Sequence, residues 1–116
     1  MDYTPEFCAR VAKVHRNITI TAWLHKGKAV AWYVAPEVPV PGEERHEIMG
    51  IQTEIVRSIL KTNEDYFGRA RYIMMSMENA DVFHFVGKDP DYGLSVIVRR
   101  PYEHEALVQG VLATLS

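Results

Sequence analysis

Two strand-like segments near the start of the chain constrain the fold more than any other feature. From residue 18 the hydrophobic period is two, so one face carries Ile18, Ile20, Ala22 and Leu24 and the other carries Thr19, Thr21, Trp23 and His25. The next segment, AVAWYVA at 29–35, is apolar on both faces. Between them, HKGK predicts a hairpin turn, because Gly27 can adopt positive φ. A strand that is apolar on both faces indicates a sheet covered on both sides, by helices in a mixed domain.

The rest of the chain divides into further helices and strands. Thr4 can cap a first helix that has Pro5 at its first position. Later segments with helical or strand periodicity are a helix at 43–61, strands at 71–77, 81–87 and 94–100, and a last helix at 102–115. We therefore predict one α+β domain over residues 1–116, with the order α-β-β-α-β-β-β-α.

Composition narrows the class of protein. The 116 residues suit one domain, and 47% hydrophobic residues, 24% charged residues and a net charge of -2 indicate neither disorder nor a nucleic-acid-binding surface. The longest uncharged stretch is far shorter than the ~20 apolar residues that a bilayer requires, and MDYTPEF has no secretory pattern. We expect a cytoplasmic protein that binds neither nucleic acid nor membrane. The single cysteine, Cys8, lies in a helical pattern and is expected to be a buried, inert thiol.

The sequence HEIMG, at 46–50, resembles the first part of the HExxH zinc helix of metalloproteases. That motif needs a second histidine four residues after the first, but Gly50 stands there and offers no ligand. Asp89 and Asp91 have the beginning of a calcium spacing without the rest of that loop pattern. The chain also lacks a glycine-rich phosphate loop and a nucleophile elbow. We predict no metal site, no cofactor and no catalytic residue.

The helix at 43–61 carries two apolar strips. Ile48, Ile51, Ile55 and Ile59 form a tight stripe that we expect to face the core, and Met49, Val56 and Leu60 form a second strip on its flank. The polar side is expected to carry His46, Gly50, Glu54, Arg57 and Lys61, with Glu54 and Arg57 paired across one turn. The second strip indicates either a deeply seated core helix or a helix that a partner covers.

Two other groups of residues are candidate sites. Four arginines near strand ends could gather an anion, although arginines in such places usually meet water: Arg69, Arg71, Arg99 and Arg100. Four side chains on strands could line a ligand pocket between sheet and helix, although aromatic residues on strands are more often core: Trp23, Tyr33, His84 and Phe85. The second group would make the domain a small-molecule sensor.

The element order, its spacing and the segment YGLSVIVRRPYEHEALVQGVLATL resemble the roadblock and dynein light chain family, whose domains have a profilin-like fold. The resemblance spans nearly the whole chain. It implies a five-stranded antiparallel sheet in the order 2-1-5-4-3, with the second helix on one face and the terminal helices on the other. It also implies a non-catalytic module that dimerises and acts as a platform or regulator for small GTPases, motors or signalling complexes. The sequence differs from many members in its bridge APEVPVPGEER and in the pair Arg99 and Arg100.

We expect a homodimer formed by the second helix and the third strand. The third strand would lie at a sheet edge, yet YIMMSM contains no charge and no proline to block pairing. The expected interface residues are Met49, Gln52, Val56, Leu60, Tyr72, Ile73, Met74, Met75, Ser76 and Met77. A two-fold axis beside this strand would join the two sheets into one.

Overall fold

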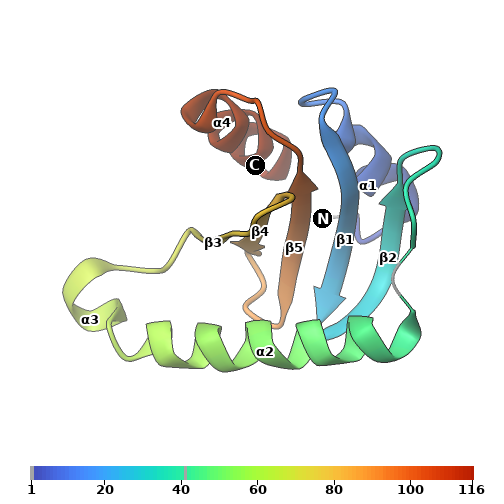
Figure 1. Ribbon diagram of the computed structural model, residues 1–116. Helices are drawn as coiled ribbons and strands as arrows, with labels where there is room; N and C mark the ends of the chain where they lie inside the picture. The colour runs from blue at the N-terminus through green and yellow to red at the C-terminus, as the bar shows by residue number, and fades with distance from the viewer. Residues whose placement is uncertain (1, 41) are drawn as a thin grey trace.

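A five-stranded antiparallel sheet forms the centre of the molecule, as Figure 1 shows. The computed structural model describes residues 2–40 and 42–116. The strands are β1 (Ile18–His25), β2 (Lys28–Val34), β3 (Tyr72–Ser76), β4 (Asp81–Val86) and β5 (Tyr92–Val98). Their order across the sheet is β2-β1-β5-β4-β3. The predicted fold class and strand order are confirmed.

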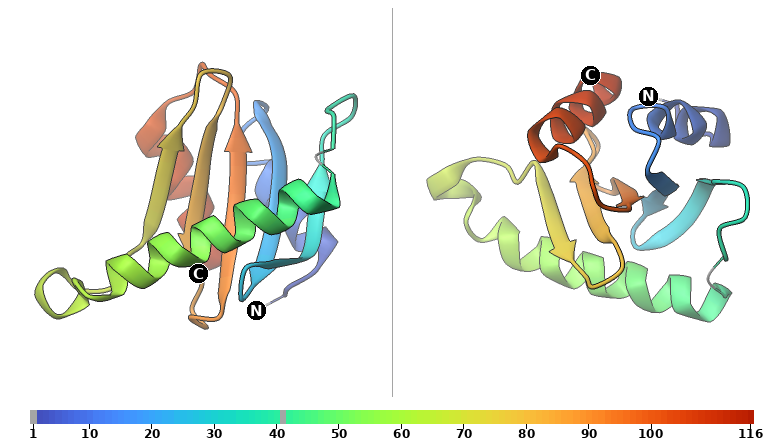
Figure 2. Two further views of the ribbon diagram at one scale, coloured as in Figure 1. Left: turned by 60° about the horizontal axis from the view of Figure 1, so that its bottom comes forward. Right: turned by 45° about the horizontal axis from the view of Figure 1, so that its top comes forward.

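Helices lie on both faces of this sheet. They are α1 (Pro5–Ala12), α2 (Glu43–Lys61), α3 (Glu64–Phe67) and α4 (His104–Leu115). Two views in Figure 2 place α1 and α4 behind the sheet and α2 in front of it, crossing the strands nearer one end. The single turn α3 lies past the β3 edge, beyond the end of α2. None of the described helices combines the length and the apolar character that crossing a bilayer would require.

The face of the sheet toward α1 and α4 is closed by a continuous core. Its centre is made of side chains with no exposed surface, including Trp23, Phe83, Phe85, Leu94, Val96, Val108 and Val111. Cys8 belongs to this core, and burial raises the pKa of its thiol. The expected burial of Cys8 is confirmed. This core includes residues near both ends of the described chain, such as Phe7 and Leu115.

Local signals set the element boundaries. The hydroxyl of Thr4 accepts a hydrogen bond from the Phe7 amide at 3.2 Å, which caps α1 as predicted. The carboxylate of Glu103 accepts one from the Ala106 amide at 2.6 Å, so α4 begins after Glu103 and not at Tyr102. The strand-like start of β5 also lies two residues earlier than its apolar run. Polar and glycine residues at strand ends explain this difference, because backbone pairing continues past the hydrophobic pattern.

The hairpin between β1 and β2 has positive φ at both central residues, 51° at Lys26 and 82° at Gly27. This geometry matches the twist of the flanking strands and confirms the predicted turn. The short helix α3 was not predicted, because one turn is too brief to produce a hydrophobic period.

Candidate interaction surface

A close contact between two glycines fixes the position of α2 on the sheet. Gly50 is the buried residue of α2, and a Cβ built there would lie 1.8 Å from the carbonyl oxygen of Gly27. Only a residue without a side chain lets the helix approach the β1–β2 hairpin so closely. The position that breaks the zinc motif is therefore the point at which helix and hairpin meet.

The side of α2 that faces the protein is its polar side. The Arg57 side chain is only 12% exposed; it forms an ion pair with Glu54 at 2.7 Å and donates to the carbonyl of Pro90. The predicted pair between Arg57 and Glu54 is confirmed. Its predicted location is wrong, because these residues and Gly50 lie against the sheet and the β4–β5 loop rather than on the solvent side.

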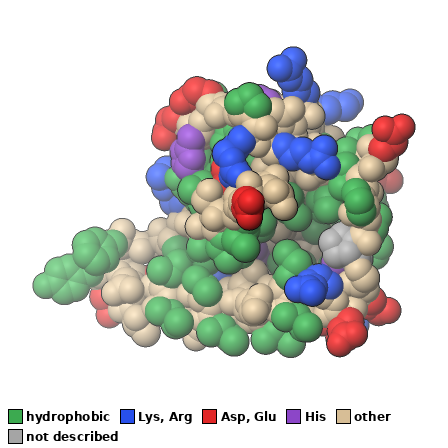
Figure 3. Space-filling model, in the orientation of Figure 1, with side chains coloured by type: hydrophobic (Ala, Val, Ile, Leu, Met, Phe, Trp, Pro, Cys, Tyr) green, Lys and Arg blue, Asp and Glu red, His purple; other side chains and the backbone are tan. Residues whose placement is uncertain are grey.

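The isoleucine stripe points away from the sheet. Ile48 is 44% exposed, Ile51 59%, Ile55 56% and Ile59 60%, and we call these four residues the isoleucine face. The prediction that they face the core is wrong. A helical wheel separates an apolar side from a polar side, but it cannot say which side meets the chain's own sheet. Figure 3 shows hydrophobic side chains along the outer side of α2 and at the protruding end where α3 lies.

His84 lies beneath α2 and explains why a polar helix side fits there. It is 5% exposed, and within the described chain neither ring nitrogen has a hydrogen-bond partner. Burial, with a smaller contribution from the Arg57 charge, lowers the pKa of His84 to about 4. Gly93 leaves room for the ring, since a Cβ there would lie 2.2 Å from Nε2. The centre of this face is therefore polar and small, unlike the aromatic core behind the sheet.

The sheet next to α2 is only half covered. Strand pairing places Ile73, Met75, Val82 and Ile97 on the same face as His84, and we call these four residues the open sheet face. All of them retain exposed surface, and Met75 is 44% exposed. The hollow between α2 and the β4–β5 loop is lined by Glu54, Ser58 and Pro90 among others. Leu60 also lines this hollow, and Val56, elsewhere on α2, is 36% exposed.

The expected interface residues lie on this side of the molecule. Within the described chain β3 pairs with β4 alone, so its outer edge is free. Met74 and Met77 are exposed beside Met75, while Tyr72 and Ile73 are half-buried. On α2, Gln52 and Val56 are exposed, and Met49 and Leu60 are half-buried. A bare strand edge thus borders an incompletely covered sheet face.

The four arginines do not gather into one anion site. Arg69 donates to the carbonyl of Gly87 at 2.9 Å, just after the end of β4. Arg100 instead pairs with Asp81 at the start of the same strand. Arg71 lies over the Tyr72 ring, and Arg99 is exposed. The hypothesis of a single cluster is wrong, because cross-strand geometry sends these side chains to opposite ends of the sheet.

Arg100 belongs to a structural cluster around Asp81. This buried carboxylate accepts hydrogen bonds from Ser76 at 2.6 Å and from the Tyr102 hydroxyl at 2.5 Å, besides its pair with Arg100. Hydrogen bonds from Ser76 and Tyr102 lower the pKa of Asp81, and the Arg100 charge adds to this effect. The cluster joins the β3–β4 turn to the segment before α4. It was missed in the sequence because its members lie on three separate segments: the end of β3, the start of β4 and the stretch before α4.

The aromatic ligand pocket is also wrong as predicted. Trp23 and Phe85 are fully buried in the core toward α1 and α4, and Tyr33 packs against that core. His84 points to the other face, because neighbouring residues on a strand alternate. The four side chains therefore line no common cavity, and the small-molecule sensor loses the site that motivated it.

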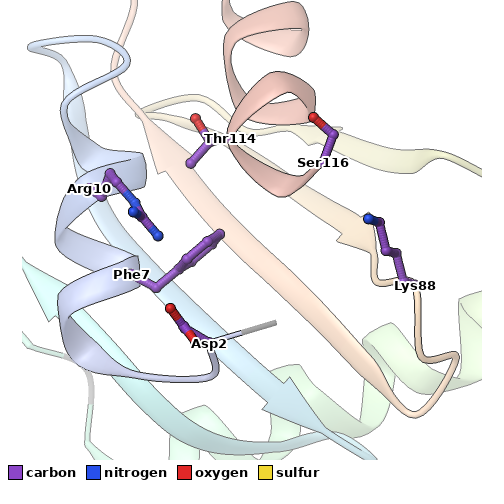
Figure 4. Close-up of a pocket in the computed structure, with 6 residues that line it drawn as sticks. All are labelled: Asp2, Phe7, Arg10, Lys88, Thr114 and Ser116. Atoms are coloured by element: carbon purple, nitrogen blue, oxygen red, sulfur yellow. The ribbon is translucent and has the colours of Figure 1, made fainter.

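Figure 4 shows the hollow between α1 and α4, which has a volume of about 500 Å³. Its lining mixes Asp2, Arg10 and Lys88 with Phe7, Thr114 and Ser116. Phe7 alone among them is buried, and the guanidinium of Arg10 lies 4.9 Å from its ring centre. The charged groups lie at the surface and converge on no single point, so the hollow resembles a seam between helices. Within residues 2–40 and 42–116, no three potential metal-binding side chains come together.

Comparison with solved structures places this architecture. The Roadblock/LC7 domain from Streptomyces avermitilis matches with a TM-score of 0.72 and 12% identity, over 96% of this chain and 90% of that one. An MglB protein with a tetrameric arrangement matches with a TM-score of 0.76 and 10% identity, over 96% and 81% of the two chains. This chain has the Roadblock/LC7 fold. MglC from Myxococcus xanthus is similar too, with a TM-score of 0.68 and 12% identity over 95% and 91%. No protein-family model and no curated protein matches the sequence.

Proposed function

We propose that this chain is a non-catalytic homodimeric module that serves as a scaffold or regulator for other proteins. The observation that carries the proposal is that the unpaired edge of β3 lies beside a half-covered apolar face of the sheet. Monomeric proteins normally block such edges with charge, proline or a bulge. The self-association of an MglB protein with the same fold supports the same conclusion.

A two-fold axis perpendicular to the sheet and next to β3 satisfies both features at once. The two β3 strands pair antiparallel, and one sheet runs through the dimer. The same rotation carries the end of each α2 across the β3 edge toward the other copy. The flank near the end of α2, with Val56 and Leu60, then meets the second copy's α2, whereas Met49 and Gln52 lie nearer the β1–β2 hairpin. Of the interface residues expected from the sequence, this arrangement brings together Val56, Leu60 and residues 72–77.

The energetics of this arrangement favour association. Burying an apolar side chain fully is worth about 1.5 to 3 kcal/mol, and a half-exposed one about half of that. Val56, Leu60 and the open sheet face contribute such side chains from both copies. Their total is of the same order as the cost of about 4 to 15 kcal/mol for lost freedom on association. Backbone pairing along β3 adds specificity.

The isoleucine face would remain outside in this dimer. Four half-exposed isoleucines on each α2, side by side with their symmetry mates, form an apolar surface typical of protein binding sites. We assign this surface to a protein partner, and the resemblance to roadblock platforms favours a small GTPase or a signalling protein. The absence of a catalytic constellation in the sequence agrees with a role as a platform.

The experiment compares two charged double variants by light scattering after size exclusion. Val56→Glu with Leu60→Glu should give a folded monomer, because both charges enter the proposed interface. Ile51→Glu with Ile55→Glu should remain a dimer and lose only partner binding. Val40→Glu is the matched control, since Val40 is 60% exposed and lies on the bridge before α2. A dimer that survives the first variant but dissociates in the second would place the isoleucines in the interface and contradict the proposal.

A further inference from the structure

The helix α3 carries two aromatic side chains that the chain itself leaves in solvent. Tyr66 is 89% exposed and Phe67 is 82% exposed, and their ring centres lie 5.6 Å apart. Burial of side chains of this size is among the largest favourable terms at protein interfaces. Figure 3 shows hydrophobic side chains at the tip of this projection.

The projection is a defined structure. The Phe67 amide donates to the Asn63 carbonyl at 3.0 Å, and the Gly68 amide donates to the Glu64 carbonyl at 2.9 Å. Gly68, with φ 80°, then turns the chain back toward β3. The aromatic pair is therefore presented on a closed helical turn, which lowers the entropy lost when the pair is buried.

The direction of the projection identifies what it meets. The helix α2 has 19 residues and is about 28 Å long. The sheet is only about 19 Å wide from the axis of β2 to the axis of β3. Because α2 is anchored at Gly50 to the hairpin of the β2 edge, its far end passes the β3 edge and carries α3 outward. If β3 pairs with β3 of a second copy, anything beyond that edge on this face lies over the second copy's sheet.

We propose that Tyr66 and Phe67 pack on the open sheet face of the second copy. This inference rests on the proposed homodimer and adds to it a reciprocal latch, in which each copy completes the other's sheet. The two-fold rotation carries α3 to the end of the sheet that α2 leaves uncovered, where Met75, Val82 and Ile97 retain exposed surface. The exposed pair Tyr66 and Phe67 of one copy and the open sheet face of the other thus bury each other.

The first test is the double variant Tyr66→Ser with Phe67→Ser, measured by sedimentation equilibrium. The dimer should still form, but its dissociation constant should rise roughly tenfold or more, as expected for loss of buried aromatic anchors. Glu64→Gln with Asp65→Asn is the matched control on the same turn and should leave the constant unchanged. An unchanged constant in the aromatic variant would overturn the latch.

The second test is disulfide cross-linking between introduced cysteines. The chain's single cysteine, Cys8, is buried and should not compete in this reaction. A chain with Phe67→Cys mixed with a chain with Val82→Cys should form a disulfide-linked heterodimer under mild oxidation. No such product despite a dimer of normal mass would overturn the latch and leave the homodimer intact. A wild-type chain that is monomeric at all accessible concentrations would overturn both proposals. If the Val56→Glu and Leu60→Glu variant were monomeric but the Tyr66→Ser and Phe67→Ser variant kept the wild-type dissociation constant, only the latch would be overturned.

Discussion

The two faces of the sheet differ in how completely this chain covers them. Toward α1 and α4, aromatic and branched side chains such as Phe83 and Val108 have no exposed surface. Toward α2, the helix meets the sheet through Gly50 and Arg57, while its isoleucine face points outward. Residues of the same chain bury the centre of the first face. On the second face, apolar side chains remain exposed. The first face maintains the fold, and we propose the second as the surface for association.

The largest expected effect is a core truncation on the closed face. Phe85→Ala should lower the free energy of unfolding by about 3 to 5 kcal/mol, because it removes a fully buried ring and leaves a cavity. Ile55→Ser on the isoleucine face should change it by less than about 0.5 kcal/mol. Urea denaturation monitored by circular dichroism measures both values. Similar losses in the two variants would mean that the isoleucine face is part of the monomer's core.

The pH dependence of stability tests whether the His84 imidazole is buried beneath α2. The pKa of His84 is about 4 in the folded chain, below its usual 6.5, so the imidazole is neutral in both states above pH 6.5. As the pH falls from 6.5 to 4, the unfolded chain binds the proton first and stability is lost, by about 3 kcal/mol in total. His84→Leu should remove this part of the pH dependence. Urea denaturation at several pH values between 4 and 6.5 measures this dependence. If the free energy of unfolding changed equally with pH in the wild type and in His84→Leu, the low pKa of His84 would be refuted.

A smaller effect is expected where α2 touches the hairpin. Alanine usually stabilises a helix interior relative to glycine by about 1 kcal/mol. Gly50→Ala should instead destabilise the fold by about 1 to 3 kcal/mol, because the new methyl group would overlap the Gly27 carbonyl. Gly42→Ala is the control, since a Cβ there meets no atom within 4 Å. Thermal denaturation of both variants measures the contrast, and a more stable Gly50→Ala would show that α2 shifts freely on the sheet.

Much of the architecture could be predicted from local patterns. The period of two from Ile18, the turn at Gly27 and the helix at 43–61 gave the elements, and the resemblance gave the sheet order. The sites were predicted less well. Trp23 and His84 were assigned to one pocket but lie on opposite faces, and Arg69 and Arg100 bind groups at opposite ends of β4. Such errors arise because periodicity reports which side of an element a residue occupies, but not which elements become neighbours.

The sequence by itself determined the helices and strands other than α3, the apolar pattern around Cys8 and the lack of charge in β3, because each depends on residues close together in the chain. Only the tertiary structure decided which side of α2 faces the sheet. The contact of Gly50 with Gly27, and the room that Gly93 leaves for His84, turn the polar side inward and the isoleucines outward. The hydrophobic effect favours burial of the apolar side, but it does not distinguish the chain's own sheet from a surface on another protein.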